Sequence, residues 1–175
     1  VCMTEGGLSG IDNCEAGAMC WDVDAKNMGI CVALCKGTKF VPICDEGFSC
    51  PLTSEPVLNL CLSECDPLLQ DCAGDKLCVP INVTFVCVPD VSGDMGKTND
   101  ACEFVGGCDK GLVCLNISAG SSACMKDAVG CCQPFCDFTA MELCPNFDQE
   151  CVQWFDPMMP IPPGLEDVGI CAIPI

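Results

Sequence analysis

The sequence predicts a small disulfide-rich, all-β protein, built as an elongated tandem array of five four-cysteine β-hairpin units with little helix. Three observations predict this fold class: 22 of the 175 residues are cysteine, a short cysteine pattern recurs along the chain, and aromatic residues make up only 6%. Cysteine at this density marks a disulfide scaffold, and so few aromatic residues cannot fill a large core. We therefore expect covalent cross-links to hold the fold.

A seven-residue segment with a cysteine at each end defines the repeat. It appears as CEAGAMC, CDEGFSC, CAGDKLC and CDKGLVC, and a divergent CPNFDQEC follows near the C-terminus. Recurrence of this kind is the signature of a repeat protein. One further cysteine stands on each side of the segment, so each repeat contains four cysteines. Some neighbouring repeats are separated by only three residues, which favours repeats in contact and an elongated stack.

Grouping the cysteines in fours leaves only the adjacent pair Cys131 and Cys132 unassigned. Four cysteines allow more than one connectivity. We favour first-to-third with second-to-fourth bonds, because joining the middle two closes a short loop, whereas interleaved bonds close longer loops and constrain the unfolded chain more. For the adjacent pair we favour bonds within the chain over a bond to another chain. The predicted pairs are Cys2 with Cys20, Cys14 with Cys31, Cys35 with Cys50, Cys44 with Cys61, Cys65 with Cys78, Cys72 with Cys87, Cys102 with Cys114, Cys108 with Cys124, Cys136 with Cys151, and Cys144 with Cys171.

In chain order, the segment between the third and fourth cysteines of each repeat predicts a short hairpin, because apolar runs flank turn residues there. A polar, turn-rich stretch at 89–101 is the only linker-like segment. We therefore divide the chain into repeats one to three (1–88), a linker-like loop (89–101) and repeats four and five (102–175). The strands predicted in the second, third and fourth repeats are 49–53 and 57–61, 77–81 and 83–88, and 112–116 and 123–125.

The chain is strongly acidic. It has 25 acidic residues against seven lysines, a formal net charge of −18, and no arginine, histidine or tyrosine. Because little in it can neutralise phosphates, we expect no nucleic-acid partner. The main alternative use of so many cysteines is a thiolate metal cluster. The absence of C-x-C and C-x2-C spacings and of histidine favours disulfides instead.

Oxidised cysteines indicate an oxidising location: secreted, periplasmic or at the cell surface. The chain opens at Val1-Cys2 without the charged and apolar regions of a secretion signal, and we expect that signal to have been removed. No apolar stretch approaches the ~18 residues of a membrane-spanning helix, so we expect no membrane span. Apolar residues make up 50% of the chain and the mean hydropathy is +0.41. A thin fold cannot bury so much apolar surface, which favours contact with a partner.

No catalytic arrangement can be assembled from these residue types. Without histidine or tyrosine, and with the thiols oxidised, neither a nucleophilic triad nor a zinc-bound water is available, so we expect no enzymatic activity. Calcium is the one cofactor that the sequence allows. Asp90, Asp94 and Asp100 place several carboxylate oxygens in one loop, which suits a hard cation, although the spacing is not that of an EF-hand. The alternative is that these residues form simple Asx turns.

Two N-x-[ST] sequons, at Asn82 and Asn116, lie in predicted hairpins. In a eukaryotic secreted protein they are glycosylation candidates. In a bacterium, the serines of 118–122 are equally good candidates for a hydroxyl-linked sugar. The choice depends on the source of the protein.

Four segments carry a resemblance to known proteins: CDPLLQDCAGDKLC from Cys65, VPDVSGD from Val88, GCCQPFCD from Gly130 and PGLEDVGICAIP from Pro163. Residues 65–175 resemble cysteine-rich secreted proteins of myxobacteria and related bacteria. The resemblance implies a bacterial cell-surface or extracellular setting and little chemistry. Some such proteins bear a pentose-phosphate epimerase label. This chain does not fit that label, because it has no histidine to ligate the metal and no alternating strand–helix pattern for the barrel.

Two function classes fit these observations. The first is a structural subunit of an extracellular fibre or cell-surface layer that self-associates head-to-tail as a homopolymer; the alternative is a secreted binding module such as an inhibitor, adhesin or ligand. We expect self-association to use the two ends of the chain, of which the C-terminus is apolar, and the long proline-rich segment before Cys171, because Trp, Phe and Met are enriched at interface centres. The alternative is that this segment caps the last repeat. The interface candidates are Trp154, Phe155, Met158, Met159, Ile173 and Ile175.

Overall fold

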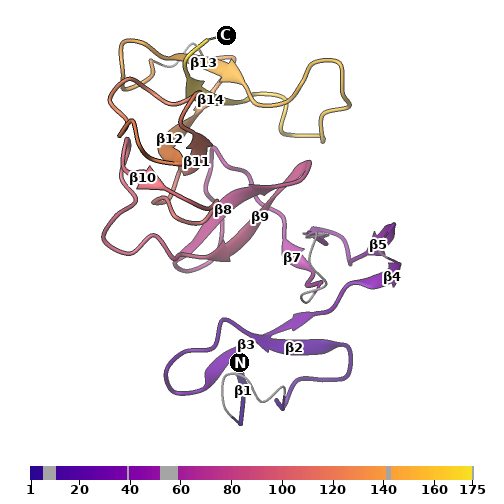
Figure 1. Ribbon diagram of the computed structural model, residues 1–175. Coiled ribbons are helices and arrows are strands. Elements are labelled where there is room, and N and C mark those ends of the chain that lie inside the picture. Colours follow the sequence, from indigo (N-terminus) through magenta and orange to yellow (C-terminus); the bar gives the residue numbers. More distant parts are fainter. Residues whose placement is uncertain (6–10, 39, 52–58, 141–142, 175) are drawn as a thin grey trace. The chain divides into compact units, whose positions relative to one another are not determined.

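The computed structural model describes residues 1–5, 11–38, 40–51, 59–140 and 143–174. Within these ranges the regular structure consists of antiparallel strands and turns. The chain forms two units, which we call the N-terminal lobe (Val1–Glu64) and the C-terminal lobe (Cys65–Ile175) (Figure 1). The predicted class of small disulfide-rich all-β protein is confirmed, because the 22 cysteines form eleven disulfides.

No helix among the described residues has the length and apolar character needed to cross a membrane.

One arrangement of hairpin and disulfides recurs in four of the five repeats. The third cysteine lies directly opposite the fourth in an antiparallel strand pair, so both side chains project to the same face. There the third cysteine bonds to the first and the fourth bonds to the second, which ties both strands to the loop that precedes them. The opposed pairs are Cys20 and Cys31, Cys78 and Cys87, Cys114 and Cys132, and Cys151 and Cys171.

The first repeat forms a three-stranded sheet in the order β1-β3-β2. An Asx turn joins its two longer strands: the Asp24 carboxylate accepts hydrogen bonds from the backbone N–H groups of Lys26 (2.8 Å) and Met28 (3.0 Å). This side chain supplies the acceptor that fixes the turn. The strands are β1 (Cys2–Met3), β2 (Ala18–Trp21) and β3 (Met28–Ala33).

The second repeat consists of two separate two-stranded pairs. β4 (Lys36–Thr38) pairs with β5 (Val41–Ile43), and β6 (Phe48–Ser49) pairs with β7 (Leu62–Ser63). The first pair is a hairpin that the sequence reasoning did not predict. The hairpin predicted at 49–61 falls largely on 52–58, which lie outside the described residues.

The third repeat forms the predicted hairpin, with β8 (Lys76–Ile81) and β9 (Thr84–Pro89). Its two-residue turn begins at Asn82, which has a φ of 57°. Asparagine tolerates this left-handed conformation better than most residues.

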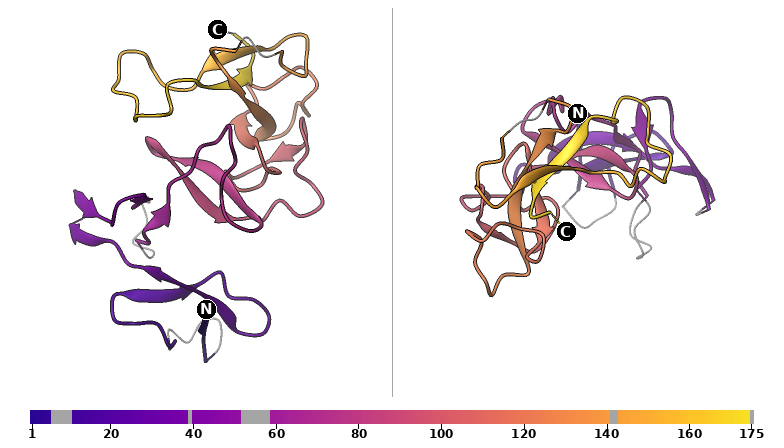
Figure 2. Two further views of the ribbon diagram at one scale, coloured as in Figure 1. Left: turned by 180° about the vertical axis from the view of Figure 1, so that it is seen from behind. Right: turned by 90° about the horizontal axis from the view of Figure 1, so that it is seen from above.

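The fourth and fifth repeats share one strand. β12 (Gly130–Asp137) pairs along its first half with β11 (Leu112–Asn116) and along its end with β14 (Val168–Ala172). The two views of Figure 2 show this strand running between the two repeats. A single backbone ladder therefore joins them. The sheet is completed by β10 (Ala101–Cys102) beside β12 and by β13 (Glu150–Gln153) beside β14.

Nine of the ten predicted disulfides are present in the structure. The predicted bond between Cys108 and Cys124 is wrong: Cys108 bonds to Cys132, and Cys124 bonds to Cys131. The reason is strand register, because β12 places Cys132 opposite Cys114. Residues 117–129 are therefore an insertion within the hairpin, and the return strand predicted at 123–125 is wrong as well. The insertion has its own disulfide at its end.

A glycine two residues before the fourth cysteine identifies the correct partner. It occurs in the first, fourth and fifth repeats as GIC, GCC and GIC, at Gly29, Gly130 and Gly169. A Cβ atom on Gly130 would lie 2.7 Å from the Sγ of Cys114, and one on Gly169 would lie 2.7 Å from the Sγ of Cys151. The third cysteine's sulfur thus lies against the return strand where no side chain fits. The position of Gly130 therefore indicates Cys132 as the fourth cysteine of the fourth repeat.

A hydrophobic core joins the last three repeats. Phe85 on β9 is fully buried, and its ring centroid lies 5.5 Å from that of Phe135 on β12 and 5.7 Å from that of Trp154. The ring centroid of Phe155 lies 6.2 Å from that of Phe85. Val113, Val168 and Ile170 are among the buried residues of this cluster. A few aromatic residues from distant positions therefore build a core.

This core crosses the segment that we expected to divide the chain. Residues 89–101 lie within the C-terminal lobe, and the boundary between the lobes falls after Glu64. None of the eleven disulfides crosses that boundary. The third repeat groups with the fourth and fifth because Phe85 fills their core.

Candidate functional site

The cysteines offer no thiol chemistry in the oxidised protein. In each repeat, three sulfur atoms lie within 4.8 Å of one another, a spacing that would suit a metal ion if they were thiolates. All of them are disulfide sulfurs. The short distances show that the two bonds of each repeat lie side by side, and a metal would require their reduction.

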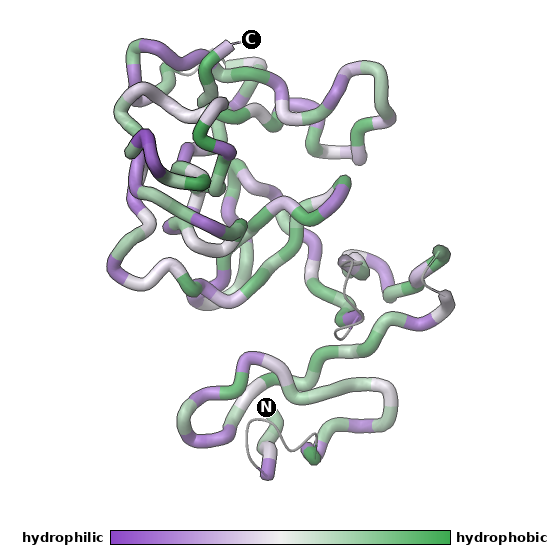
Figure 3. Tube along the Cα trace, viewed as in Figure 1, coloured by the Kyte–Doolittle hydropathy of each residue, from purple (hydrophilic) through white to green (hydrophobic). Residues whose placement is uncertain are grey.

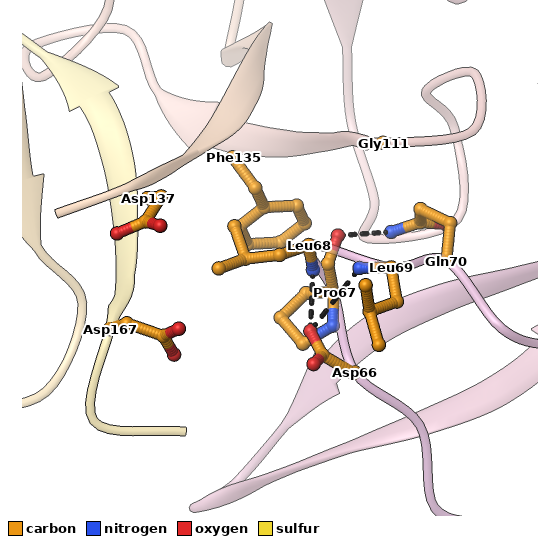
Figure 4. A pocket seen from close by; sticks show the side chains of 9 residues that line it. All are labelled: Asp66, Pro67, Leu68, Leu69, Gln70, Gly111, Phe135, Asp137 and Asp167. Atoms are coloured by element: carbon orange, nitrogen blue, oxygen red, sulfur yellow. Dashed lines mark hydrogen bonds between the residues drawn. The ribbon is translucent and has the colours of Figure 1, made fainter. Parts of the chain in front are cut away.

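An acidic pocket of about 360 Å³ lies in the C-terminal lobe (Figure 4). Three carboxylates line it. Asp137 ends β12, Asp167 precedes β14 next to it, and Asp66 comes from the start of the third repeat. Leu68 and Phe135 supply apolar wall between these carboxylates. The arrangement suits a cation with an apolar stem.

Local hydrogen bonds fix two of these carboxylates. Asp66 accepts hydrogen bonds from the backbone N–H groups of Leu68 (2.8 Å) and Leu69 (3.3 Å). Asp137 accepts from the hydroxyl of Thr139 (2.7 Å), from its N–H (2.8 Å) and from the N–H of Ala140 (3.0 Å). The Thr139 hydroxyl is the main cause that holds the pKa of Asp137 below its ordinary value. This carboxylate is therefore charged at neutral pH.

A second, apolar pocket of about 420 Å³ lies along β10 in the same lobe. Side chains that are more than half exposed line it: Val91, Met95, Phe104 and Val129. Two carboxylates, Glu103 and Asp127, also line it, and its lining includes no lysine. We call this surface the apolar pocket. The apolar pocket lies at an edge of the sheet, because β10 is the terminal strand of that sheet.

The predicted calcium ligands form local turns. Asp90 accepts hydrogen bonds from the N–H (2.9 Å) and the hydroxyl (2.7 Å) of Ser92, and Asp100 accepts from the N–H of Lys97 (3.0 Å). Asp94 is exposed. Among the described residues, these three carboxylates do not form a cluster with metal-ligand spacing. Calcium binding stays a prediction.

Both sequon asparagines are exposed on hairpins of the C-terminal lobe. Asn82 lies in the β8–β9 turn, and Asn116 ends β11. The Asn116 side-chain oxygen accepts hydrogen bonds from the N–H (3.0 Å) and the hydroxyl (2.8 Å) of Ser118. Exposure makes both asparagines accessible to an enzyme, and glycosylation at either one stays a prediction.

The predicted interface residues divide into two groups. Trp154 and Phe155 are partly buried and pack against the core. Their placement fits the alternative stated above, in which this segment caps the last repeat. Met158 is 89% exposed and Met159 60%, on the loop between β13 and β14 that extends from the sheet in Figures 1 and 2. Ile173 is partly exposed, and its N–H donates to the carbonyl of Ala119 (3.1 Å). Ile175 lies outside the described residues.

Sequence reasoning missed both pockets. Asp66, Asp137 and Asp167 are far apart in the chain, and only the pairing of β12 with β14 and the core around Phe135 bring them together. Apart from the two residues of β10, the residues of the apolar pocket belong to loops and turns with no periodic pattern. No spacing in the sequence signals either site.

Comparison with protein-family models, with curated proteins and with solved structures finds no match to this chain. The resemblance to myxobacterial cysteine-rich proteins therefore stays a prediction. The many disulfides fit an extracellular or secreted protein.

Proposed function

We propose that the protein is a structural subunit of an extracellular fibre or cell-surface layer, formed by association of copies of this chain. It has no catalytic role in this proposal. The observation that carries it is apolar surface left uncovered on disulfide-held segments. Val41 on β5, Phe104 beside β10 and Met158 on the β13–β14 loop are 64%, 56% and 89% exposed. Figure 3 shows hydrophobic residues along β5 and along the C-terminal loops.

Uncovered side chains of this kind favour association. Single exposed apolar residues are ordinary, but groups of them on ordered segments mark contact surfaces. The disulfides hold these segments in place, so little conformational entropy is lost on binding. A subunit that is cross-linked internally also resists unfolding in a harsh extracellular setting.

Sedimentation velocity and negative-stain electron microscopy of the purified, fully oxidised chain test this proposal. We expect the sedimentation coefficient to rise with concentration and ordered filaments or sheets to form. The solution should contain no disulfide between chains, because the cysteines pair internally. A chain that remains monomeric over the whole accessible concentration range, with and without calcium, would contradict the proposal.

The acidic pocket supports a second candidate, a secreted binding module. Its three carboxylates and its wall of Phe135 and Leu68 fit the charged end and apolar stem of a lysine or arginine side chain. Calorimetric titration with a lysine-rich peptide tests this function. Binding by a monomer, abolished by Asp66→Asn with Asp167→Asn and retained in Asp75→Asn, would favour the binding module. Asp75 is exposed and does not line the pocket.

A further inference from the structure

The hairpin of β4 and β5 presents one amphipathic face. Its register places Lys36 opposite Ile43 and Thr38 opposite Val41. Opposed residues share a face of an antiparallel pair, and alternate residues along each strand return to that face. These four side chains therefore form one surface, which we call the hairpin face. The third opposed pair, Gly37 with Pro42, lies between these two pairs along the hairpin.

The hairpin face is exposed although two of its members are β-branched and apolar. Val41 is 64% and Ile43 54% exposed, and all three residues of β4 are exposed. An isolated two-stranded hairpin is marginally stable in water. Here Cys35 directly precedes β4 and Cys44 directly follows β5. Their disulfides, Cys35–Cys50 and Cys44–Cys61, therefore hold both strands at the base of the hairpin. The fold thus presents an apolar strand surface that its own sheet pairing does not cover.

The apolar pocket is complementary to this face in chemistry. It offers apolar side chains, among them Val91 and Phe104, for a valine and an isoleucine. Glu103 and Asp127 supply negative charge for a lysine, and the lining contains no competing cation. The pocket also lies along β10, a two-residue strand that ends its sheet.

Charge identifies the occupant. The chain carries −18 formal charge with only seven lysines, so most of its surface repels another copy. The hairpin face combines one of these few lysines with uncovered apolar side chains, and the apolar pocket has carboxylates and apolar side chains. Resting on the proposed function, we infer that the hairpin face of one copy binds the apolar pocket of a second copy. The two surfaces are different patches of one chain, so the contact is heterologous, and in the proposed fibre it repeats from copy to copy.

Charge reversal with recombination tests this contact. The hairpin variant is Lys36→Glu, and the pocket variant is Glu103→Lys with Asp127→Lys. Each places like charges across the contact between identical copies, which should raise the concentration needed for assembly at least about tenfold. An equimolar mixture should assemble again, because each hairpin face then meets a pocket of opposite charge, and the two variants alternate along the filament.

Matched controls are Glu46→Lys in the N-terminal lobe and Lys110→Glu in the C-terminal lobe. Both residues are exposed and lie outside the two surfaces, and both variants should assemble as the wild type does. Disulfide mapping should show the native eleven bonds in every variant. A variant with all three reversals should assemble alone.

The outcomes separate the contact from the proposed function. If the hairpin or pocket variant assembles alone at the wild-type concentration, or if the mixture stays unassembled, the contact is wrong while the subunit function stands. If the variant with all three reversals does not assemble alone while the wild type does, charge pairing between the two surfaces does not drive assembly and the inference is overturned. A wild type that never assembles removes the proposed function together with the contact.

Discussion

Phe85 lies at the centre of the aromatic core of the C-terminal lobe. It is fully buried and contacts three other aromatic rings. Phe85→Ala should lower the free energy of unfolding by about 3–5 kcal/mol, because it leaves a cavity among side chains that the disulfides keep from collapsing. Urea denaturation of the oxidised protein measures this loss.

Phe147→Ala is the matched control, since Phe147 is 99% exposed. Its effect should stay within about 0.5 kcal/mol. Equal effects of the two substitutions would show that the aromatic core adds nothing to the cross-links.

Asp137 should titrate below its ordinary value of 3.8, chiefly because the Thr139 hydroxyl donates to its charged form. A depressed pKa in the folded state means that this hydrogen bonding stabilises the fold at pH values above the unfolded pKa. The contribution is lost as pH falls through the lower, folded pKa. Carboxyl-carbon NMR across an acid titration measures the shift.

In Thr139→Val the pKa of Asp137 should move back up toward its ordinary value. The backbone N–H groups of Thr139 and Ala140 still donate, so part of the depression should persist. An unchanged pKa in this variant would assign the shift to the backbone alone.

A buried network of amide side chains in the C-terminal lobe was not predictable from the sequence. Gln133 is fully buried and donates to the side chain of Asn99 (3.1 Å) and to the sulfurs of Cys124 (3.3 Å) and Cys131 (3.1 Å). Gln149 donates to Gln133 (2.7 Å) across the fourth and fifth repeats. Nothing in the pattern of polar residues distinguishes these side chains from solvated ones. The core contacts of Trp154 and Phe155 were not predictable for the same reason, because their partner Phe85 lies far away in the chain.

At the level of elements, the two disulfides near the insertion at 117–129 close loops of different length. Cys108–Cys132 has a sequence separation of 24 and ties the β11–β12 hairpin to its preceding loop, whereas Cys124–Cys131 has a separation of 7. Loop-closure entropy predicts that removing the wider bond costs about 3.5 kcal/mol and the narrower one about 2.5 kcal/mol. Paired Cys→Ser variants, compared by calorimetry, give both values.

Peptide mapping must first show that the remaining bonds of each variant are native. A larger loss from the narrower bond would indicate that its contacts with Gln133 outweigh loop entropy.

The hairpin of the third repeat was predictable, because no insertion interrupts it. The third repeat folds as its apolar runs on each side of Asn82 indicate, and β11 has the predicted bounds of 112–116. The partner of β11 was not predictable from spacing alone, because Cys124, Cys131 and Cys132 all follow in one stretch. The strand register places Cys132 opposite Cys114, and Gly130 is the residue that indicates this register in the sequence.

For the molecule as a whole, the lobe boundary predicts which pieces of the chain fold alone. Residues 1–64 and 65–175 should each form their native disulfides when produced separately, because no bond crosses between them. Residues 102–175 should not, because they lack Phe85 and leave the aromatic core open. Disulfide mapping and near-ultraviolet circular dichroism of the three fragments test this. A native 102–175 fragment would restore the division at 89–101 that the sequence suggested.

The bond between Cys124 and Cys131 also sets a requirement on biosynthesis. A chain that enters an oxidising compartment N-terminus first exposes its cysteines in order of sequence. In four repeats the second cysteine bonds to the next cysteine after the third. In the fourth repeat Cys124 arrives before Cys132, and Cys108 meets the wrong partner first. We expect a bond between Cys108 and Cys124 formed at that stage to be exchanged through thiolate attack once the later cysteines arrive, so the fourth repeat should depend more on disulfide isomerisation than the other four.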